Sequence, residues 1–482
     1  MRERVLFSTL PVLSRVSPAL TVFIFFAVTL SGITLAVYPG SSWVYLSFSA
    51  AFNSLLLVGF MKRRIFFETF MGIFFWLGFW FKFSVTLSFI DGWFVEPVGN
   101  FNFSPAAFDR ALLLSTLAAV ALLLASRLRE KFLNYYDRPL VHDPLYEIYK
   151  RWRIRAWAGF AILAVIVAGT NAYFGIYRKG LIPETVLPLG LSNLYPLALI
   201  FGLSSVSAML LNFELRRGGT CLPAFLLSLG ECFLSNVSML SRGMVLNGAS
   251  LLLGSDAAAA RRPVRPGLIL RLGILALFAG MFFVSILTVN YMRATSFATD
   301  AVGASKELGA TTPVHSFVSR WVGIEGVMSV SGSSELGWDL WQEAWREPFS
   351  NSGTSFYDKN LLKDSPYLRA GVENKHFVTL PGLTAFLYYP GSAAFLFAAM
   401  LALGLFGALV DYAVYRVSGG NLILCAVIGQ VLAGRYAHFG YAPSHSHMLL
   451  GGILLVAGLV WAARNRAAAY EVSGPLREGS GK

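Results

Sequence analysis

Charged side chains and histidines that could bind an anion or move a proton gather in a polar stretch, residues 290–380, of an otherwise apolar chain. Four arginines lie within this stretch or at the ends of apolar segments: Arg242, Arg293, Arg320 and Arg435. A guanidinium group binds phosphate through two parallel hydrogen bonds and keeps its charge in any surroundings. The pattern therefore predicts an anion site at one membrane face. For Arg293 it favours the alternative, a solvated charge at the membrane interface.

Candidate proton acceptors accompany these arginines. His376 and Glu325 lie in the polar stretch. His438 follows Arg435 by three residues, a spacing that places both on one face of a helix. An imidazole or a carboxylate can remove the proton of an attacking hydroxyl group. Glu325 has an alternative role as the ion-pair partner of a neighbouring arginine.

Two of the charged residues inside apolar segments are further candidates. Glu231 shares one helical face with three serines, Ser228, Ser235 and Ser238. A carboxylate in a membrane span usually faces a cavity or a partner, and the alternative is a close-packed serine face on which Glu231 pairs with a neighbouring helix. Lys82 lies near the outer end of a highly aromatic segment, where its stem can extend to the membrane interface. The sequence favours this extended placement and keeps Lys82 as a candidate ligand of the anion.

Membrane spans must position these residues. The chain has 482 residues, of which 56% are hydrophobic and only 13% are charged, a composition far from that of soluble domains. A span needs roughly 20 apolar residues. About twelve segments qualify: 19–37, 42–60, 65–90, 105–126, 156–176, 187–211, 222–240, 243–260, 267–290, 389–414, 420–438 and 447–463. The predicted fold is an all-α polytopic membrane protein.

Basic residues orient these spans, because the ends that carry them face the cytoplasm. They cluster at alternate ends of the segments: Arg2, Arg4, 62–64, 127–155, 216–217, 261–265, Arg416, Arg464 and Arg466. Both termini are then cytoplasmic, and the apolar stretch 222–260 crosses the membrane twice. The predicted organisation is spans 1–9 in residues 1–290, one large external loop in 291–380, spans 10–12 in 381–466 and a cytoplasmic tail in 467–482.

The external loop contains two patterns of apolar residues at helical spacing, around residues 317–328 and 338–345. The second carries three tryptophans on one face and is followed by Pro348. Gly323 and Gly326 weaken the first as a helix. Both patterns predict amphipathic helices that lie along the outer membrane surface.

Several functional classes find no support in the sequence. The net charge of +13 arises from short loops between apolar segments, so it indicates orientation rather than nucleic-acid binding. The three cysteines form no disulfide or metal pattern. His445 and His447 lack a third ligand at suitable spacing, so no metal site is predicted. No P-loop, GxGxxG or Asp-x-Asp motif occurs, and no cofactor is expected.

Three segments in the second half of the chain carry a family resemblance: SNVSMLSRGMVLNGASLLLG (235–254), SRWVGIEGVMSV (319–330) and KHFVTLPGLTAFLYYPGS (375–392). They resemble the Wzy-type O-antigen and exopolysaccharide repeat-unit polymerases and, more distantly, the O-antigen ligases. The resemblance implies a GT-C-like fold in a bacterial inner membrane. It also implies undecaprenyl-pyrophosphate-linked oligosaccharides as donor and acceptor, and a polysaccharide chain-length regulator as a further partner.

By this resemblance Arg242 and Arg320 bind the pyrophosphate, with Arg435 as a third ligand, and His376 corresponds to the external histidine of the ligases. A lipid pyrophosphate is a good leaving group, so cationic donors can stabilise its departure without a metal. His376 or Glu325 would take the proton of the acceptor hydroxyl, and a single displacement would invert the anomeric carbon. The expected function is polymerisation of lipid-linked repeat units at the periplasmic face. The alternatives are an O-antigen ligase and, from another class, a transporter or flippase for lipid-linked oligosaccharide.

Overall fold

The computed structural model describes residues 18–61, 65–94, 96–132, 143–179, 182–218, 221–241, 245–261, 268–297, 318, 321–349, 354–362 and 378–473. Within these ranges every regular element is a helix. Nine of the described helical segments are long and apolar enough to cross a membrane. At this level the prediction of an all-α polytopic membrane protein is confirmed.

Helices of two lengths make up the apolar part of the molecule. The long segments are α1 (Pro18–Val37), α2 (Ser42–Gly59), α3 (Phe66–Phe75) continued by η1 (Trp76–Phe81) and α4 (Lys82–Phe89), α5 (Pro105–Phe132), α6 (Pro144–Phe174), η2 (Pro188–Asn193) continued by α7 (Leu194–Leu197), η3 (Ala198–Gly202) and α8 (Leu203–Arg217), α11 (Leu268–Phe297), α19 (Ala393–Val417) and α21 (His445–Ser473). The shorter helices are α9 (Leu222–Ser238), α10 (Val245–Ala260) and α20 (Leu422–Ala437). The stretch 222–260 therefore forms two helices, as expected, and twelve crossings stay a prediction.

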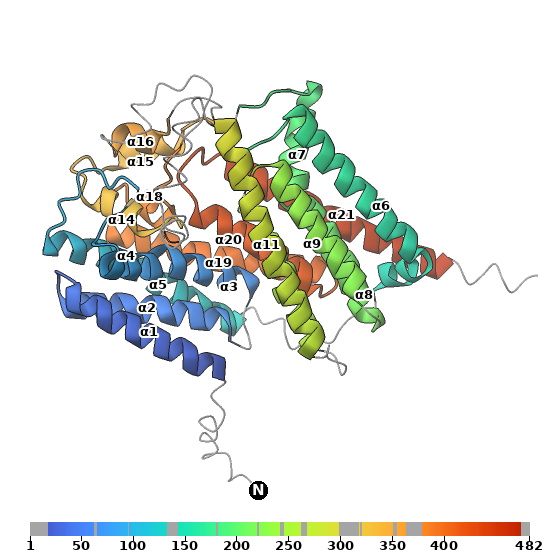
Figure 1. The fold of residues 1–482 in the computed structure, drawn as a ribbon, viewed down its shortest axis with the longest axis horizontal. Coiled ribbons are helices and arrows are strands. Elements are labelled where there is room, and N and C mark those ends of the chain that lie inside the picture. Colours follow the sequence, from blue (N-terminus) through green and yellow to red (C-terminus); the bar gives the residue numbers. More distant parts are fainter. Residues whose placement is uncertain are drawn as a thin grey trace, which may run out of the picture.

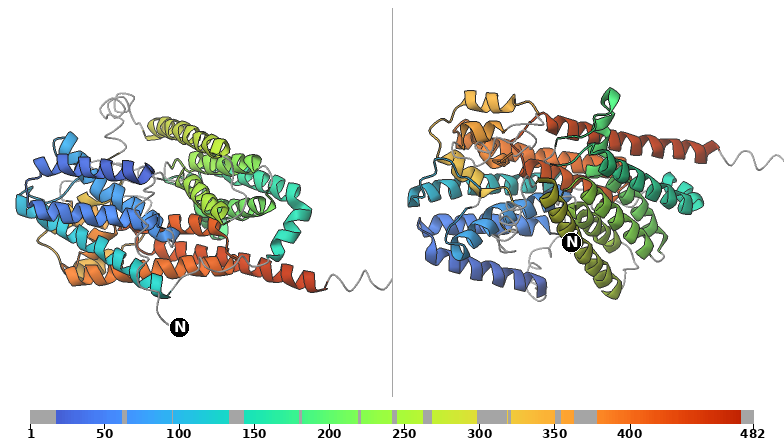
Figure 2. Two further views of the ribbon diagram at one scale, coloured as in Figure 1. Left: turned by 90° about the horizontal axis from the view of Figure 1, so that it is seen from below. Right: turned by 45° about the horizontal axis from the view of Figure 1, so that its top comes forward.

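Two groups of helices meet on α20. It packs against α3, α8, α10 and α19, with α1–α5 on one side of the molecule and α6–α11 on the other (Figure 1). Figure 2 shows the same division from two further directions. Apart from Gln430 and Arg435, the sequence of α20 is apolar on all sides, which is typical of a helix buried among others. Glycine permits the close packing, since a Cβ on Gly254 of α10 would lie 2.7 Å from the Cα of Ile423.

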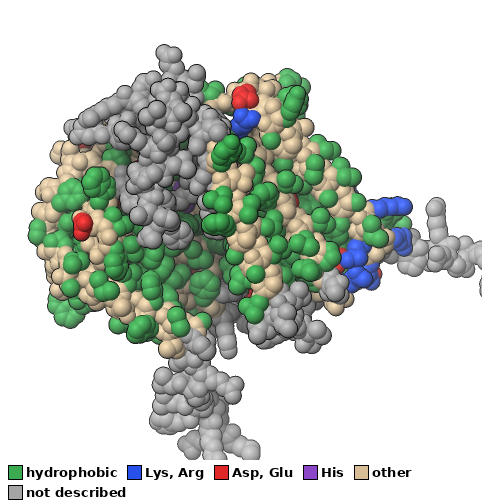
Figure 3. Space-filling view, viewed as in Figure 1, with side chains coloured by type: hydrophobic (Ala, Val, Ile, Leu, Met, Phe, Trp, Pro, Cys, Tyr) green, Lys and Arg blue, Asp and Glu red, His purple; other side chains and the backbone are tan. Residues whose placement is uncertain are grey.

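The surface agrees with a position in lipid. Side chains on the face drawn in Figure 3 are mainly hydrophobic, and Lys and Arg gather where α6 begins and α8 ends. Large apolar side chains are exposed on several long helices, among them Phe25 of α1, Phe283 of α11 and Leu454 of α21. Exposed apolar surface of this extent marks contact with a membrane or a partner.

The helices have their termini at two ends of the molecule, the loop end and the opposite end. The loop end holds the ends of α4, α9 and α20 together with four short helices: α14 (Ile324–Ser331), α15 (Trp338–Trp345), α16 (Phe356–Asn360) and α18 (Leu383–Leu387). The opposite end holds the beginning of α6, the end of α8 and the turn between α19 and α20.

The first predicted surface helix is placed differently in the structure. All eight residues of α14 are buried, and the helix packs against α5 and α18 rather than along the membrane surface. The prediction was wrong because the apolar spacing did not reveal that the glycines allow a helix to be enclosed on all sides. The second pattern forms α15, as expected, and Trp338 and Trp341 of α15 pack on Phe395 at the start of α19.

Candidate functional site

A buried ion pair joins the third membrane segment to the loop-end helices. Lys82, the first residue of α4, pairs with Glu325 in the first turn of α14 and donates a hydrogen bond of 2.9 Å to the carbonyl oxygen of Trp321. The two side chains are only 2% and 4% exposed. The sequence favoured a Lys82 side chain that extends to the membrane interface. The buried position of Lys82 contradicts this prediction. The alternative role predicted for Glu325 was an ion pair with a neighbouring arginine. Glu325 does form an ion pair, but its partner is Lys82.

Glycines bring the two segments into contact. A Cβ on Gly78 of η1 would overlap the carbonyl oxygen of Val322, and one on Gly323 would overlap the carbonyl oxygen of Gly78. Gly326 lies in the same way against the carbonyl of Pro381. Gly78 belongs to a π-helical turn, a distortion that is frequent at functional sites. The glycines that weakened the helix prediction are thus the residues that let α14 reach Lys82.

A polar cavity of about 220 Å³ lies beside the ion pair. Its walls come from five parts of the chain: Lys82, residues 96–97, residues 321–323 with 325–326, Tyr357 and residues 378–380. Two buried oxygens, Oε1 of Glu325 and Oγ1 of Thr379, have no hydrogen-bond partner among the residues that the structure describes. An unsatisfied buried polar atom usually indicates a bound water or ligand. The cavity greatly exceeds the roughly 30 Å³ that one water occupies in the liquid.

Glu96 is a lining residue that the sequence analysis missed. It lies in the loop between α4 and α5. The pKa of Glu96 is raised to about 7, mainly by burial and also by the negative charges of Glu325 and Asp358, whereas the positive charge of Lys82 opposes the rise. A carboxyl group with this pKa is suited to general acid–base catalysis at neutral pH. The signal available in the sequence was an acid, one of two with Asp91, in the short loop directly after the segment that carries Lys82.

The carboxylates of the cavity differ in their surroundings. Burial also raises the pKa of Glu325, but Lys82 lowers it through charge attraction and a hydrogen bond. The carboxylate of Asp358 is already hydrogen-bonded within the protein. It accepts hydrogen bonds from the Ser355 hydroxyl at 2.7 Å and from the Thr379 N–H at 3.1 Å. These two bonds fix the wall of residues 378–380 against α16. Glu96 and Glu325 are therefore the acids available to a bound group.

Arg435 and His438 lie together at the loop end of α20. Arg435 donates hydrogen bonds to the Ser446 hydroxyl and to the carbonyls of Tyr441 and Ala442, and no described carboxylate pairs with it. His438 follows the last residue of the helix, so the two do not share a helical face as predicted. Nδ1 of His438 lies 2.9 Å from the Gly434 carbonyl, which only accepts, so Nε2 of the neutral ring is an acceptor.

The His438 ring joins this pair to the cavity. It packs edge-on against Phe74, which also contacts Trp321 of the cavity wall. Lys82 and Arg435 both contribute positive charge at His438. The structure thus brings together four of the residues predicted from sequence: Lys82, Glu325, Arg435 and His438.

Glu231 lies outside this group. It accepts hydrogen bonds from the hydroxyls of Ser204 on α8, at 3.1 Å, and of Ser235, at 2.9 Å. Ser238, on the same helix, donates to the carbonyl of Ala168 and accepts from Asn171 of α6. The alternative of a packed serine face with a link to the neighbouring helix is therefore the one observed.

The side chains of four further predicted residues lie outside what the structure describes. Arg242, Arg320 and His376 lie outside the described residues, and for Arg293 only the backbone within α11 is described.

No protein-family model, curated protein or solved structure matches this chain. The described cavity combines an ion pair, two unsatisfied oxygens and an acid of pKa about 7. Such a site can orient a bound hydroxyl group and exchange a proton with it.

Proposed function

We propose that this protein is a membrane glycosyltransferase that polymerises undecaprenyl-pyrophosphate-linked oligosaccharide repeat units. The observation that carries the proposal is the polar cavity at the loop end, which Glu96 and Glu325 line together with Lys82. The motif resemblance supports it, because SRWVGIEGVMSV supplies one part of the cavity wall, including Glu325. We further propose a GT-C-like membrane fold in a bacterial inner membrane, with the loop end at the periplasmic face.

In the proposed reaction the acceptor hydroxyl enters the cavity and Glu96 accepts its proton as it attacks the anomeric carbon. A base is most effective when its pKa is near the working pH, which favours Glu96 (pKa about 7). Glu325, held by Lys82, orients the hydroxyl through its unsatisfied oxygen. The C–O bond to the lipid pyrophosphate breaks with the electron pair leaving on the pyrophosphate.

The cations at this end stabilise the leaving pyrophosphate. Arg435 carries a charge that no described carboxylate balances, and guanidinium groups bind phosphate in two-pronged geometry. No metal is required if fixed cations stabilise the developing negative charge. A single displacement inverts the configuration of the anomeric carbon, and linkage analysis of the product tests this directly.

The test is a polymerisation assay with purified protein and an undecaprenyl-pyrophosphate oligosaccharide. We expect a ladder of products separated by one repeat unit in mass. Glu96→Gln should reduce the rate by the 10²–10⁴-fold typical of a lost general base. Glu343→Gln is the matched control, because it makes the same chemical change at an exposed position of α15.

The outcomes separate the competing functions. A ladder that Glu96→Gln abolishes and Glu343→Gln preserves supports the proposal. Transfer only to a lipid A core acceptor indicates a ligase. Movement of the lipid-linked substrate across a proteoliposome membrane, with no new glycosidic bond, indicates a transporter. Either of the last two results overturns the proposed polymerase.

A further inference from the structure

A basic cavity lies at the opposite end of the molecule from the candidate site. Its volume is about 820 Å³, and it is lined by residues 150–155 of α6 and by Arg217 at the end of α8. Five of its seven lining side chains are Lys or Arg. Figure 3 shows Lys and Arg side chains gathered in this part of the surface. The proposed glycosyl transfer uses none of these residues.

Positive charge in this cavity is only partly balanced. Arg151 and Arg155 are exposed, and neither forms an ion pair with a residue that the structure describes. The other three basic side chains have acidic partners: Arg153 and Arg217 lie near Glu214, at 2.5 and 3.9 Å, and Lys150 lies 2.5 Å from Glu147. Two carboxylates thus face five basic side chains, which leaves an excess of three positive charges (5 − 2). Arg151 and Arg155 are the two guanidinium groups with no described carboxylate beside them, and both are open to an anion.

Two exposed apolar residues lie between these two arginines in the sequence. Trp152 is 47% exposed and Ile154 is 78% exposed, and the guanidinium of Arg155 lies 4.3 Å from the centre of the Trp152 ring. Trp152 also has a non-helical backbone (φ −114°, ψ 16°), so α6 bends at this point. The bend separates the first turns of α6 from its long apolar part. Tryptophan and basic residues next to the end of an apolar helix are typical of the membrane–water interface.

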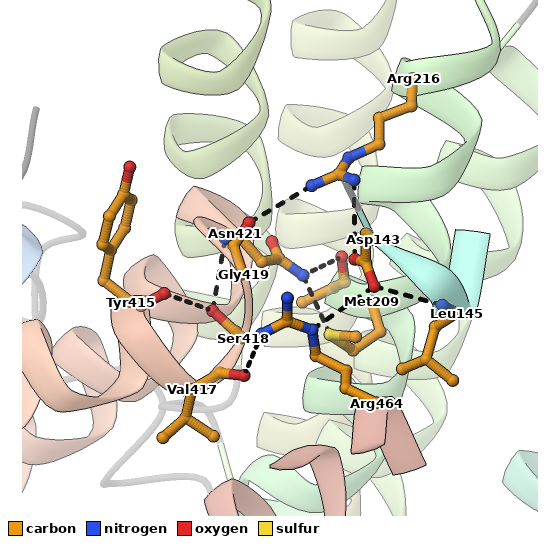
Figure 4. Close-up of polar contacts among 11 residues, drawn as sticks. Asp143, Leu145, Met209, Arg216, Tyr415, Val417, Ser418, Gly419, Asn421 and Arg464 are labelled. Carbon is orange, nitrogen blue, oxygen red and sulfur yellow. Dashed lines mark hydrogen bonds and ion pairs between the residues drawn. The ribbon is translucent and has the colours of Figure 1, made fainter. Parts of the chain in front are cut away.

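The walls of the cavity are held in place by a second polar network. Asp143 caps the start of α6 through the N–H of Leu145, and its buried carboxylate lies between Arg216 of α8 and Arg464 of α21, at 3.6 and 3.4 Å (Figure 4). Arg464 also donates to the carbonyl of Val417 at the end of α19. These contacts fix the start of α6 against the end of α8, next to the residues that line the cavity.

We propose that this cavity binds the headgroup phosphate of an anionic phospholipid of the surrounding membrane. Arg151 and Arg155 would hold the phosphate oxygens, since guanidinium groups bind phosphate through paired hydrogen bonds. Trp152 and Ile154 would contact the glycerol and the first methylene groups. Basic clusters directly beside a membrane span attract anionic lipids. Lipid binding at this cavity does not depend on the proposed enzymatic activity.

The test uses the full-length protein purified in a neutral detergent, with phosphatidylglycerol or phosphatidylcholine added. Bound lipid is counted by native mass spectrometry, and Tm is measured in parallel. Each basic side chain near an anionic surface strengthens binding roughly fivefold, so Arg151→Gln/Arg155→Gln should weaken phosphatidylglycerol binding about thirtyfold. The wild-type protein should prefer phosphatidylglycerol over phosphatidylcholine.

Arg127→Gln/Lys131→Gln is the matched control. It removes the same charge from exposed positions in the last turns of α5, outside the cavity, and should bind like the wild type. If the glutamine variant of the cavity is unstable, Arg151→Lys/Arg155→Lys keeps the charge and should still weaken binding by losing the paired hydrogen bonds. Equal loss in the control and the cavity variants overturns the proposal. It is also overturned if glycerol phosphate raises Tm as much as phosphatidylglycerol does, because the site would then bind a soluble anion.

Discussion

The buried pair of Lys82 and Glu325 allows its structural role to be separated from its chemical role. Each side chain is almost fully buried, so removing one leaves the other charge without its partner in a poorly solvated place. Breaking such a pair costs about 3–5 kcal/mol. Lys82→Met and Glu325→Leu should each lower the free energy of unfolding by this amount.

The double variant Lys82→Met/Glu325→Leu should be far more stable than the sum of the single changes. Replacing both charges by apolar groups of similar volume is often neutral or stabilising, because both desolvation penalties disappear. One loss persists, since the carbonyl of Trp321 no longer receives the hydrogen bond from Lys82. That loss is about 1–3 kcal/mol for a buried acceptor. We therefore expect the double variant to unfold within about 3 kcal/mol of the wild type.

Two measurements decide between the roles. Unfolding in mixed micelles with increasing SDS gives the stability of the four proteins in the cycle, and the polymerisation assay gives their activity. If Glu325 orients the acceptor, the double variant regains stability but stays inactive. A double variant that is both stable and fully active would refute the reasoning, because the pair would then serve packing alone. A double variant no more stable than the single ones would refute the assigned coupling.

Three other perturbations follow from the structure. The raised pKa of Glu96 lets the folded state hold more protons than the unfolded chain between about pH 4.5 and 7. The free energy of unfolding should therefore fall by up to about 3 kcal/mol as the pH rises through this range. Glu96→Gln, measured by SDS unfolding, should not show this fall. For the wild type, the pH profile of polymerisation should rise to a plateau above about pH 7 if Glu96 is the base. Asp143→Asn leaves two arginines facing each other without a carboxylate and should lower thermal stability by about 3 kcal/mol, whereas unchanged Tm would contradict the network in Figure 4. Gly326→Ala places a Cβ against the carbonyl of Pro381 and should cost about 1–3 kcal/mol in SDS unfolding, while Gly337→Ala, whose Cβ would meet open space, should be neutral.

The apolar helices were predictable because a bilayer demands a simple pattern. A run of about 20 apolar residues between polar or glycine-rich loops identifies a span regardless of its neighbours. The division of residues 222–260 into α9 and α10 followed from the basic residues on both flanks. These signals are local, and the structure reproduces them among the described residues.

The candidate site was less predictable because its members meet only through tertiary contacts. Glu325 and Lys82 were both singled out, yet nothing in either segment indicates that the two are partners. Glu96 was missed, since its pKa depends on burial by segments that lie more than 200 residues away in the chain. The role of Gly78 and Gly326 was also hidden, because close approach of two backbones leaves no trace in the spacing of apolar residues.

The position of Lys82 differs between what its own segment predicts and what the folded protein shows. An isolated third segment in a membrane would place the ammonium group at the interface, as the sequence predicted, because an unpaired charge in the bilayer is costly. In the folded protein the same group is buried, since Glu325 and the carbonyl of Trp321 replace the solvent. Glu325 is synthesised 243 residues after Lys82, as their numbering shows (325 − 82). The burial of Lys82 must therefore follow synthesis of α14, and docking of the loop-end helices completes the third segment rather than covering a finished bundle.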